Sequence, residues 1–476
     1  MMDTLARLEE DVRRDLARIA HPRQAWLTPR RAPDGSDTLD VLIVGAGQGG
    51  IAAAFGLKRE RVDNVLVIDK APEGREGPWR TYARMPTLRS PKDYTGPDLD
   101  IPSLTYEAWH TARYGAAHWA ALDLIGREDW ADYLDWVRAV TGTRVANGVE
   151  LIGIAEAGAL LRATVRQGGA ERDLYARRIV LATGQESGGR WTLPPAVDAL
   201  PTDLRAHTCE EIDFAALAGK TVLVLGAGAS AFDNAATALE AGARVHLFTR
   251  RDAVQVIQPY RAITFRGFLR HLADLDDAWR WRIMRHVLSL REGFPQHTYD
   301  RCARHDSFTL HAGAPWLSVA AEGDGVVIET PRGRMRGDYV IAGTGIDMDF
   351  AARPELARFG HNIATWGDRY APPPEEADPR LGRYPYLSGG FALEEKRPGE
   401  TPWIRRIHLF AIASTMSFGP SGSSINAMTT AVPRLVAGVT EGLFREDVPA
   451  FYERLLAYDV PQAVVPEEDI VHHGGG

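Results

Sequence analysis

A glycine-rich turn near the start of the chain has the spacing of a nucleotide-binding loop. Glycines stand at positions 45, 47 and 50 of the run Gly45-Ala46-Gly47-Gln48-Gly49-Gly50. The first permits a tight turn, the second lets the backbone approach a pyrophosphate, and the third lets the next helix pack against the strand. Asp69 follows 24 residues after Gly45, where a carboxylate accepts hydrogen bonds from ribose hydroxyls and repels a 2′-phosphate. We expect Gly45, Gly47, Gly50 and Asp69 to bind a dinucleotide such as FAD.

A second turn of the same kind occurs about 180 residues later. Its glycines are Gly226 and Gly228, and alanine takes the third position, which is a tolerated variant. We expect Gly226, Gly228, Ser230 and Ala231 to contact a second nucleotide at the start of the following helix.

The residues after this second unit differ from Asp69 in their charge. Thr249, Arg250 and Arg251 stand where the matching acid would be. A small hydroxyl and two guanidinium groups suit a phosphate rather than a ribose diol. Arg250 and Arg251 therefore predict NADPH as the second nucleotide, and the alternative is a pair of arginines on a solvated strand end.

Each turn must be positioned by a strand before it and a helix after it. Apolar runs suited to a buried parallel sheet precede both turns and recur after both helices. The expected strands are 39–44, 65–68, 221–225 and 244–248, and the expected helices are 49–60 and 229–241. The sequence thus predicts an α/β fold with two Rossmann-like dinucleotide-binding domains.

Composition excludes several classes of protein. The chain has 476 residues, a net charge of −8 and two cysteines, Cys209 and Cys302. These values argue against a disulfide scaffold, a zinc module and a general attraction to nucleic acid. The charged N-terminus and the glycine-interrupted apolar stretch 41–57 indicate neither a secretion signal nor a membrane span, so we expect a cytoplasmic location.

With these motifs in place, the chain resembles the class B flavin monooxygenases, which include the flavin-containing, Baeyer–Villiger and N-hydroxylating enzymes. The resemblance covers roughly residues 39–440 and includes three further segments. They are Gly77-Pro78-Trp79, Ala182-Thr183-Gly184 and Gly343-Thr344-Gly345. The resemblance implies that Trp79, Thr344 and Gly345 lie at the cofactors.

The resemblance also implies how the chain is divided. Residues 1–37 would form a lead helix and linker, residues 38–204 and 336–476 a discontinuous FAD domain, and residues 205–335 an inserted NADPH domain with a helical insertion. The implied reaction is hydride transfer from NADPH to FAD, reaction with O₂ to a C4a-peroxyflavin, and insertion of one oxygen into a small organic substrate.

Two departures from the family pattern affect the catalytic assignment. The family places a Phe-x-Gly-x-x-x-His segment before its second Rossmann unit, and only His207 matches it here. Flavin-containing monooxygenases carry an asparagine over the flavin, and Arg89 stands at that position. Arg89 is therefore our candidate for a catalytic group near the flavin and NADP⁺, with a structural or surface arginine as the alternative.

Three functions remain open from the sequence. The first is the FAD- and NADPH-dependent monooxygenase. The second is an NADPH-dependent flavin oxidoreductase or oxidase without oxygen insertion, although its disulfide-reducing form needs a cysteine pair that the sequence lacks. The third is a nucleotide sensor without catalysis.

The remaining chemistry-bearing residues favour structural roles. Cys209 has no evident base, and the histidines lack the spacing of a zinc site. Aromatic residues between 79 and 140 indicate either a pocket above the flavin or, more often, core packing. They are Tyr82, Tyr94, Tyr106, Trp109, Tyr114, Trp119, Trp130, Tyr133 and Trp136.

Overall fold

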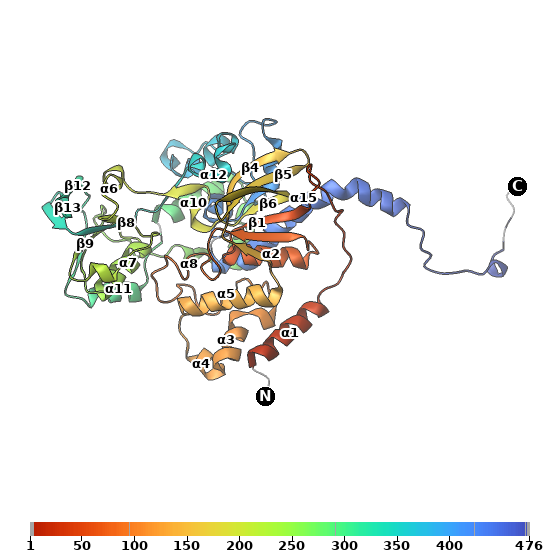
Figure 1. Cartoon of the computed structure of the whole chain (residues 1–476), viewed down its shortest axis with the longest axis horizontal. Coiled ribbons are helices and arrows are strands. Elements are labelled where there is room, and N and C mark those ends of the chain that lie inside the picture. Colours follow the sequence, from red (N-terminus) through yellow and green to blue (C-terminus); the bar gives the residue numbers. More distant parts are fainter. Residues whose placement is uncertain (1–3, 95, 291, 423, 472, 474–476) are drawn as a thin grey trace.

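The computed structural model describes residues 4–94, 96–290, 292–422, 424–471 and 473 (Figure 1). Its first sheet is centred on β1 (Thr38–Val44), which pairs in parallel with β2 and β6. β3 and β17 extend the parallel part, whereas β4 and β5 add to β6 as antiparallel strands. These strands are β2 (Val65–Asp69), β3 (Val145–Asn147), β4 (Val149–Ala157), β5 (Leu160–Gln167), β6 (Ala170–Leu181) and β17 (Ile407–Leu409).

Helices cover this sheet because their apolar faces need burial. α2 (Gln48–Arg59) runs from β1 to β2 and packs against α15 (Met428–Leu456). A side layer contacts α2 through α5 (Arg127–Thr141), and the lead helix α1 (Thr4–Arg18) packs on that layer (Figure 1). The rest of the layer is η1 (Pro102–Leu104), α3 (Tyr106–Tyr114) and α4 (Ala116–Ala121).

The second sheet is entirely parallel and lies toward the other end of the molecule (Figure 1). Its order is β11-β10-β9-β15-β8, with α7 (Ala229–Glu240) and α11 (Gln296–Ala303) packed beside it. The strands are β8 (Arg205–His207), β9 (Thr221–Leu225), β10 (Arg244–Phe248), β11 (Phe308–His311) and β15 (Tyr339–Ala342). Two parallel sheets, each with a strand-turn-helix unit, confirm the predicted α/β fold with two Rossmann-like domains.

The sheet pairing places the end of the second domain later than the sequence analysis did. β15 pairs with β8 and β9, so residues 339–342 belong to the second sheet, not to the first. Beyond β15 the chain returns through β16 (Ile346–Met348), which pairs with β7 (Gly189–Trp191) to form a ribbon between the two domains. An antiparallel sheet completes the second domain with β12 (Ser318–Glu322), β13 (Gly325–Thr330) and β14 (Gly333–Gly337).

The predicted helical insertion is present, but it packs on the C-terminal part of the first domain. Trp281 of α10 (Asp277–Leu290) is buried in a cluster with Trp366 and Met416, and its indole N–H donates to the Glu376 carbonyl at 2.9 Å. The insertion therefore spans both domains. Its other helices are α8 (Tyr260–Ile263), α9 (Arg266–His271) and η4 (Leu272–Asp274).

The remaining short helices lie mostly between residues 350 and 427. They are η2 (Gly184–Glu186), α6 (Pro195–Asp198), η3 (Ala215–Leu217), η5 (Phe350–Ala352), α12 (Pro354–Ala357), η6 (Gly360–Asn362), α13 (Trp366–Arg369), η7 (Pro374–Glu376), η8 (Leu381–Arg383), η9 (Pro402–Arg406), η10 (Ile412–Ser414), α14 (Thr415–Phe418), η11 (Ile425–Ala427) and η12 (Glu467–Asp469). Among the described residues, no helix combines the length and apolarity needed to cross a bilayer.

Candidate functional site

The first glycine turn joins β1 to α2, and at two of its positions the surrounding backbone leaves space only for glycine. Gly45 has φ +102°, and a Cβ there would lie 2.4 Å from the Ala182 carbonyl oxygen. A Cβ on Gly50 would lie 1.8 Å from the carbonyl oxygen of Gly45. Both positions exclude a larger side chain because backbone, rather than a flexible side chain, fills the space.

Gly47 and its counterpart in the second turn, Gly228, differ from Gly45 and Gly50 because neither their backbone conformation nor the surrounding protein requires glycine. They have φ −67° and −80°, which any residue adopts. Within the described part of the chain, a Cβ on Gly47 would find only the Gly77 Cα, at 3.8 Å, and one on Gly228 would find no atom within 4 Å. The protein leaves room for a side chain at both positions, as expected where the backbone must approach a pyrophosphate.

The helices after these glycines offer their N-terminal amides to an anion. α2 and α7 begin directly after Gly47 and Gly228, and neither glycine can cap its helix with a side chain. The first backbone N–H groups of such a helix lack partners inside the helix and carry its positive dipole end. The structure thus places an anion-binding helix terminus at each predicted dinucleotide turn.

Asp69 lies at the end of β2, beside the first turn. Its Oδ2 accepts the Ala46 N–H at 2.7 Å and its Oδ1 accepts the Ala71 N–H at 2.8 Å. These bonds fix the carboxylate, and the residue remains in the wall of the adjoining cavity. A carboxylate held there suits hydrogen bonds from ribose hydroxyls, and binding of a ribose by Asp69 stays a prediction.

A cavity of about 510 Å³ joins the two turns. It lies between the first domain and α7 of the second, and Thr208 and Cys209 contribute to its wall. Of the predicted site residues, the cavity collects Gly45, Gly47, Asp69, Trp79, Arg89 and Ser230. A hollow of this size between domains is the usual place for cofactor and substrate to meet.

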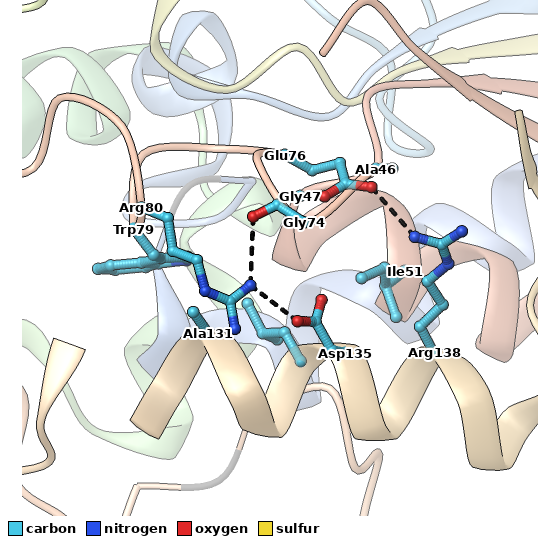
Figure 2. A pocket seen from close by; sticks show the side chains of 11 residues that line it. Ala46, Gly47, Ile51, Gly74, Glu76, Trp79, Arg80, Ala131, Asp135 and Arg138 are labelled. Carbon is cyan, nitrogen blue, oxygen red and sulfur yellow. Dashed lines mark hydrogen bonds and ion pairs between the residues drawn. The ribbon is translucent and has the colours of Figure 1, made fainter. Parts of the chain in front are cut away.

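The loop that carries Trp79 is clamped onto α5 (Figure 2). Arg80 pairs with Asp135 of α5 at 2.7 Å and donates to the Gly74 carbonyl at 3.2 Å, while Arg138 pairs with Glu76 at 3.0 Å. A small hollow of about 20 Å³ remains between this loop and Gly47, enough for one water. The two ion pairs hold the loop beside the glycine turn.

Two buried polar atoms near the first turn lack a hydrogen-bond partner among the described residues. Among the described residues, the Trp79 Nε1 and the Thr183 Oγ1 make no hydrogen bond, although both side chains lie in the cavity wall. Buried polar groups are normally satisfied. Together with the open space at Gly47 and the position of Asp69, these atoms fit a bound FAD at the first turn.

The second turn is built on the same plan with one compensating substitution. A Cβ on Gly226 would lie 2.5 Å from the Gly343 carbonyl oxygen, and one on Gly343 would lie 2.8 Å from the Cβ of Ala231. The methyl group of Ala231 thus fits at the third position because Gly343, which lies opposite it, has no side chain. Ser230 lies in the cavity wall, so this turn and α7 fit the second nucleotide.

Thr249, Arg250 and Arg251 follow β10 at the far side of the second turn. Thr249 is buried, and its Oγ1 accepts the Arg251 N–H at 3.3 Å. The Arg251 guanidinium donates to the Ser289 carbonyl at 3.0 Å. The Arg250 side chain is exposed, and no ion pair or hydrogen bond to it occurs among the residues that the structure describes. Arg250 is therefore the freer of the two arginines to meet a phosphate.

Thr344 and Gly345 lie on the ribbon between the domains, not in the cavity wall. The Thr344 hydroxyl donates to the Thr192 carbonyl, and the Thr192 N–H donates to the Gly345 carbonyl at 3.0 Å. These contacts join β16 to β7 at the crossover. Contact of Thr344 and Gly345 with a cofactor stays a prediction.

Arg89 connects the two domains through the cavity wall. Its guanidinium lies 2.6 Å from the Asp233 carboxylate on α7 and 3.6 Å from that of Glu292. Asp233 is buried and also lies 3.5 Å from Arg301 of α11. Arg89 is thus held at the boundary between the nucleotide sites, and its catalytic role stays a prediction.

One wall of the cavity was not predicted from the sequence. Tyr82, Trp191 and Cys209 all line it, and the Tyr82 and Trp191 rings lie 6.0 Å apart at 75°. Burial raises the pKa of the Cys209 thiol to about 12 and lowers that of neighbouring His207 to about 4. Cys209 is therefore a neutral thiol at neutral pH and not an activated nucleophile.

The other aromatic residues divide clearly between core and cavity. Tyr82 faces the cavity, whereas Tyr106, Trp109, Trp130 and Tyr133 are buried against one another within α3 and α5. Of the two interpretations that the sequence allowed, core packing holds for these four residues. The signal that separates Tyr82 is its place on the loop after Trp79, outside any helix.

Comparison with known proteins identifies a matching family model and a relative of the whole chain. Residues 42–269 match the pyridine nucleotide-disulphide oxidoreductase family. The chain is 43% identical over 465 residues to the FAD-dependent urate hydroxylase of Xanthomonas campestris pv. campestris, covering 97% of this chain and 98% of that one.

Solved structures share the fold at low sequence identity. The ornithine N-hydroxylase of Kutzneria sp. 744 matches with a TM-score of 0.65 and 15% identity over 85% of this chain and 99% of that one. The L-lysine 6-monooxygenase of Pseudomonas syringae matches with a TM-score of 0.65 and 18% identity over 85% of this chain and 99% of that one. The chain belongs to the family of this FAD-dependent urate hydroxylase of Xanthomonas campestris and is an FAD-dependent monooxygenase.

Proposed function

We propose that this monooxygenase hydroxylates urate or a closely related oxidised purine. The observation that carries the proposal is the 43% identity, over nearly the whole of both chains, with an FAD-dependent urate hydroxylase. The reaction would consume one NADPH and one O₂, place one oxygen atom on the purine, and release the other as water.

The cavity supports a reaction on a small flat molecule. When bound, FAD accepts hydride from NADPH and activates O₂, and this chemistry belongs to the cofactor. The chain contributes the two helix termini, the Asp69 carboxylate, and a cavity wall that contains Tyr82 and Trp191. Aromatic faces bind planar heterocycles by stacking.

We further propose roles for the predicted residues and their domains. Residues 38–204 and those after β15 would hold FAD, and the second sheet with its flanking helices would hold NADPH. Arg89 would lie where the two cofactors meet, because its pair with Asp233 spans the boundary. The use of NADPH and the two unpaired cysteines favour a cytoplasmic location.

The test is turnover by purified protein that contains FAD. NADPH oxidation and O₂ uptake would be followed with urate, xanthine, ornithine, lysine and cyclohexanone, and products would be identified by mass spectrometry. We expect urate to stimulate both rates and to yield a product one oxygen atom heavier. Equal stimulation by every compound, with all O₂ converted to H₂O₂, would instead indicate the oxidase.

A further inference from the structure

The cavity wall contains several cationic side chains, and all but one have a carboxylate partner. Lys70 pairs with Glu186 at 2.9 Å, Arg75 with Glu211 at 4.0 Å, Arg89 with Asp233 at 2.6 Å, and Arg353 with Glu355 at 2.9 Å. Arg84 lies in the same wall, and no carboxylate oxygen of the described residues lies within ion-pair distance of it. Arg84 therefore has no ion pair in this wall, and only the more distant Glu211 carboxylate offsets part of its charge.

The contacts of Arg84 orient its guanidinium without neutralising it. It donates to the carbonyl of Thr81 and, at 3.2 Å, to that of Glu210, and it lies 5.4 Å above the Phe214 ring. Burial and the nearby Arg127 lower the pKa of Arg84, and Glu211 opposes them to a smaller extent, yet a guanidinium keeps its proton at neutral pH. A half-buried cation whose direct contacts are all with neutral groups is costly and is stabilised by an anionic ligand.

The neighbours of Arg84 suit a flat molecule. Its bond to the Glu210 carbonyl places it next to Cys209, and Cys209 contacts His207 at 3.1 Å. The His207 ring lies 5.0 Å from that of Trp191, which in turn packs against Tyr82. Arg84, Tyr82 and Trp191 thus all line the same cavity.

We propose that Arg84 binds the anionic edge of a planar heterocyclic substrate beside Tyr82 and Trp191. This inference rests on the proposed function and specifies it further: the substrate binds as an anion. Urate is a monoanion at neutral pH, and its carbonyl and ring-nitrogen atoms can accept two N–H groups from one guanidinium.

A phosphate of NADPH offers similar chemistry, so the test must separate the two ligands. Arg84→Gln removes the charge and keeps a polar, although shorter, side chain. We expect the KM for urate to rise at least about tenfold, as for one charge-assisted hydrogen bond, with kcat changed by less than about threefold. The KM for NADPH should not change. A rise in the KM for NADPH with urate unaffected would assign Arg84 to the coenzyme and overturn the proposal.

Binding without turnover gives a second readout. Equilibrium dialysis of urate against the oxidised, FAD-containing protein should show the same loss of affinity in Arg84→Gln, with Arg84→Lys intermediate because it keeps the charge but not the paired N–H groups. Inhibition by hypoxanthine, which is uncharged at neutral pH, should be the same in wild type and Arg84→Gln. Equal losses for urate and hypoxanthine would mean that Arg84 only shapes the wall, and would overturn the proposal.

Arg75→Gln is the matched control, because it removes a charge from the same wall where a carboxylate partner is present. It should change the KM for urate by less than about threefold. An equal effect of both variants would indicate a general electrostatic influence and contradict a specific contact. The thermal midpoint of each variant establishes that it is folded. If wild type neither binds nor oxidises purines, the proposed function fails together with this inference, whereas normal urate binding by Arg84→Gln overturns the inference alone.

Discussion

Gly47 and Gly50 belong to the same turn, but different neighbours require glycine at each. Space remains for a Cβ on Gly47, whereas on Gly50 it would meet the Gly45 carbonyl oxygen at 1.8 Å. Gly47→Ala should therefore fold normally and lose FAD, since its methyl group would enter the space of the pyrophosphate. The measurement is the flavin content of purified protein beside the thermal midpoint of the apoprotein.

Gly50→Ala is the control for this prediction. It should lower the stability of the apoprotein itself, because backbone must move to admit the methyl group. If Gly47→Ala retains a full complement of FAD, the pyrophosphate does not lie against this glycine, and the assignment of the first turn is wrong.

Arg250 carries the prediction of coenzyme choice. Its side chain is exposed and free of partners among the described residues, while Arg251 already donates to the Ser289 carbonyl. A charge-assisted hydrogen bond contributes about 1.5–3 kcal/mol, so wild type should favour NADPH over NADH by at least about tenfold in kcat/KM. Arg250→Ala should remove most of this preference and leave NADH kinetics nearly unchanged. An equal loss with both coenzymes would mean that Arg250 is structural.

At the scale of elements, strands with a clear apolar run were predictable. The ranges 221–225 and 244–248 match β9 and β10, because a buried parallel strand needs apolar residues on both faces. The sheet to which β15 belongs was assigned wrongly, since local sequence does not determine a pairing partner more than a hundred residues away.

The cavity was less predictable for a related reason. The glycine turns and Asp69 were found from the spacing of their residues, but Arg84 differs from the other cationic residues of the cavity wall only in having no ion pair within the described residues. That property exists only after the chain has folded. β17 was missed because three residues are too few to show a period.

β17 also carries a buried histidine that should make stability depend on pH. His408 donates its Nδ1–H to the Gly390 carbonyl at 2.7 Å, and burial lowers its pKa from 6.5 to about 4. Between these pH values the unfolded chain binds a proton that the folded chain refuses, so stability falls as the pH drops from 6.5 toward 4. The contribution of His408 is at most about 3 kcal/mol.

His408→Asn removes the titrating group and keeps a donor for Gly390. The urea midpoint of the FAD-containing protein, followed by tryptophan fluorescence, should fall less steeply below pH 6.5 in this variant than in wild type. Buried His207, whose pKa is also about 4, leaves a residual slope in both proteins. Parallel curves for the two proteins would show that His408 is already protonated in the folded state.

At the scale of the whole molecule, one buried cluster joins distant parts of the chain. Arg177 of β6 is fully buried and pairs with Asp447 of α15 at 2.9 Å, with further pairs to Asp40 and Glu446. Asp447 also accepts the Thr28 N–H at 2.9 Å and pairs with Arg30. The cluster thus fastens the N-terminal linker and α15 to the first sheet, just before α15 extends away from the body (Figure 1).

This arrangement predicts a large stability loss from a small substitution. Asp447→Asn has nearly the same shape but leaves the buried Arg177 without its main counter-charge, and breaking a buried pair in this way costs about 3–5 kcal/mol. Glu441→Gln on the same helix removes an exposed pair with Arg445 and should cost less than about 1 kcal/mol. Urea unfolding of both FAD-containing variants gives the comparison. Equal stability of the two would mean that Glu446 and Asp40 suffice to balance Arg177. If the Asp447→Asn loss appears, the kinetic constants for urate and NADPH should still match wild type in the folded protein, because the cluster lies outside the cavity wall.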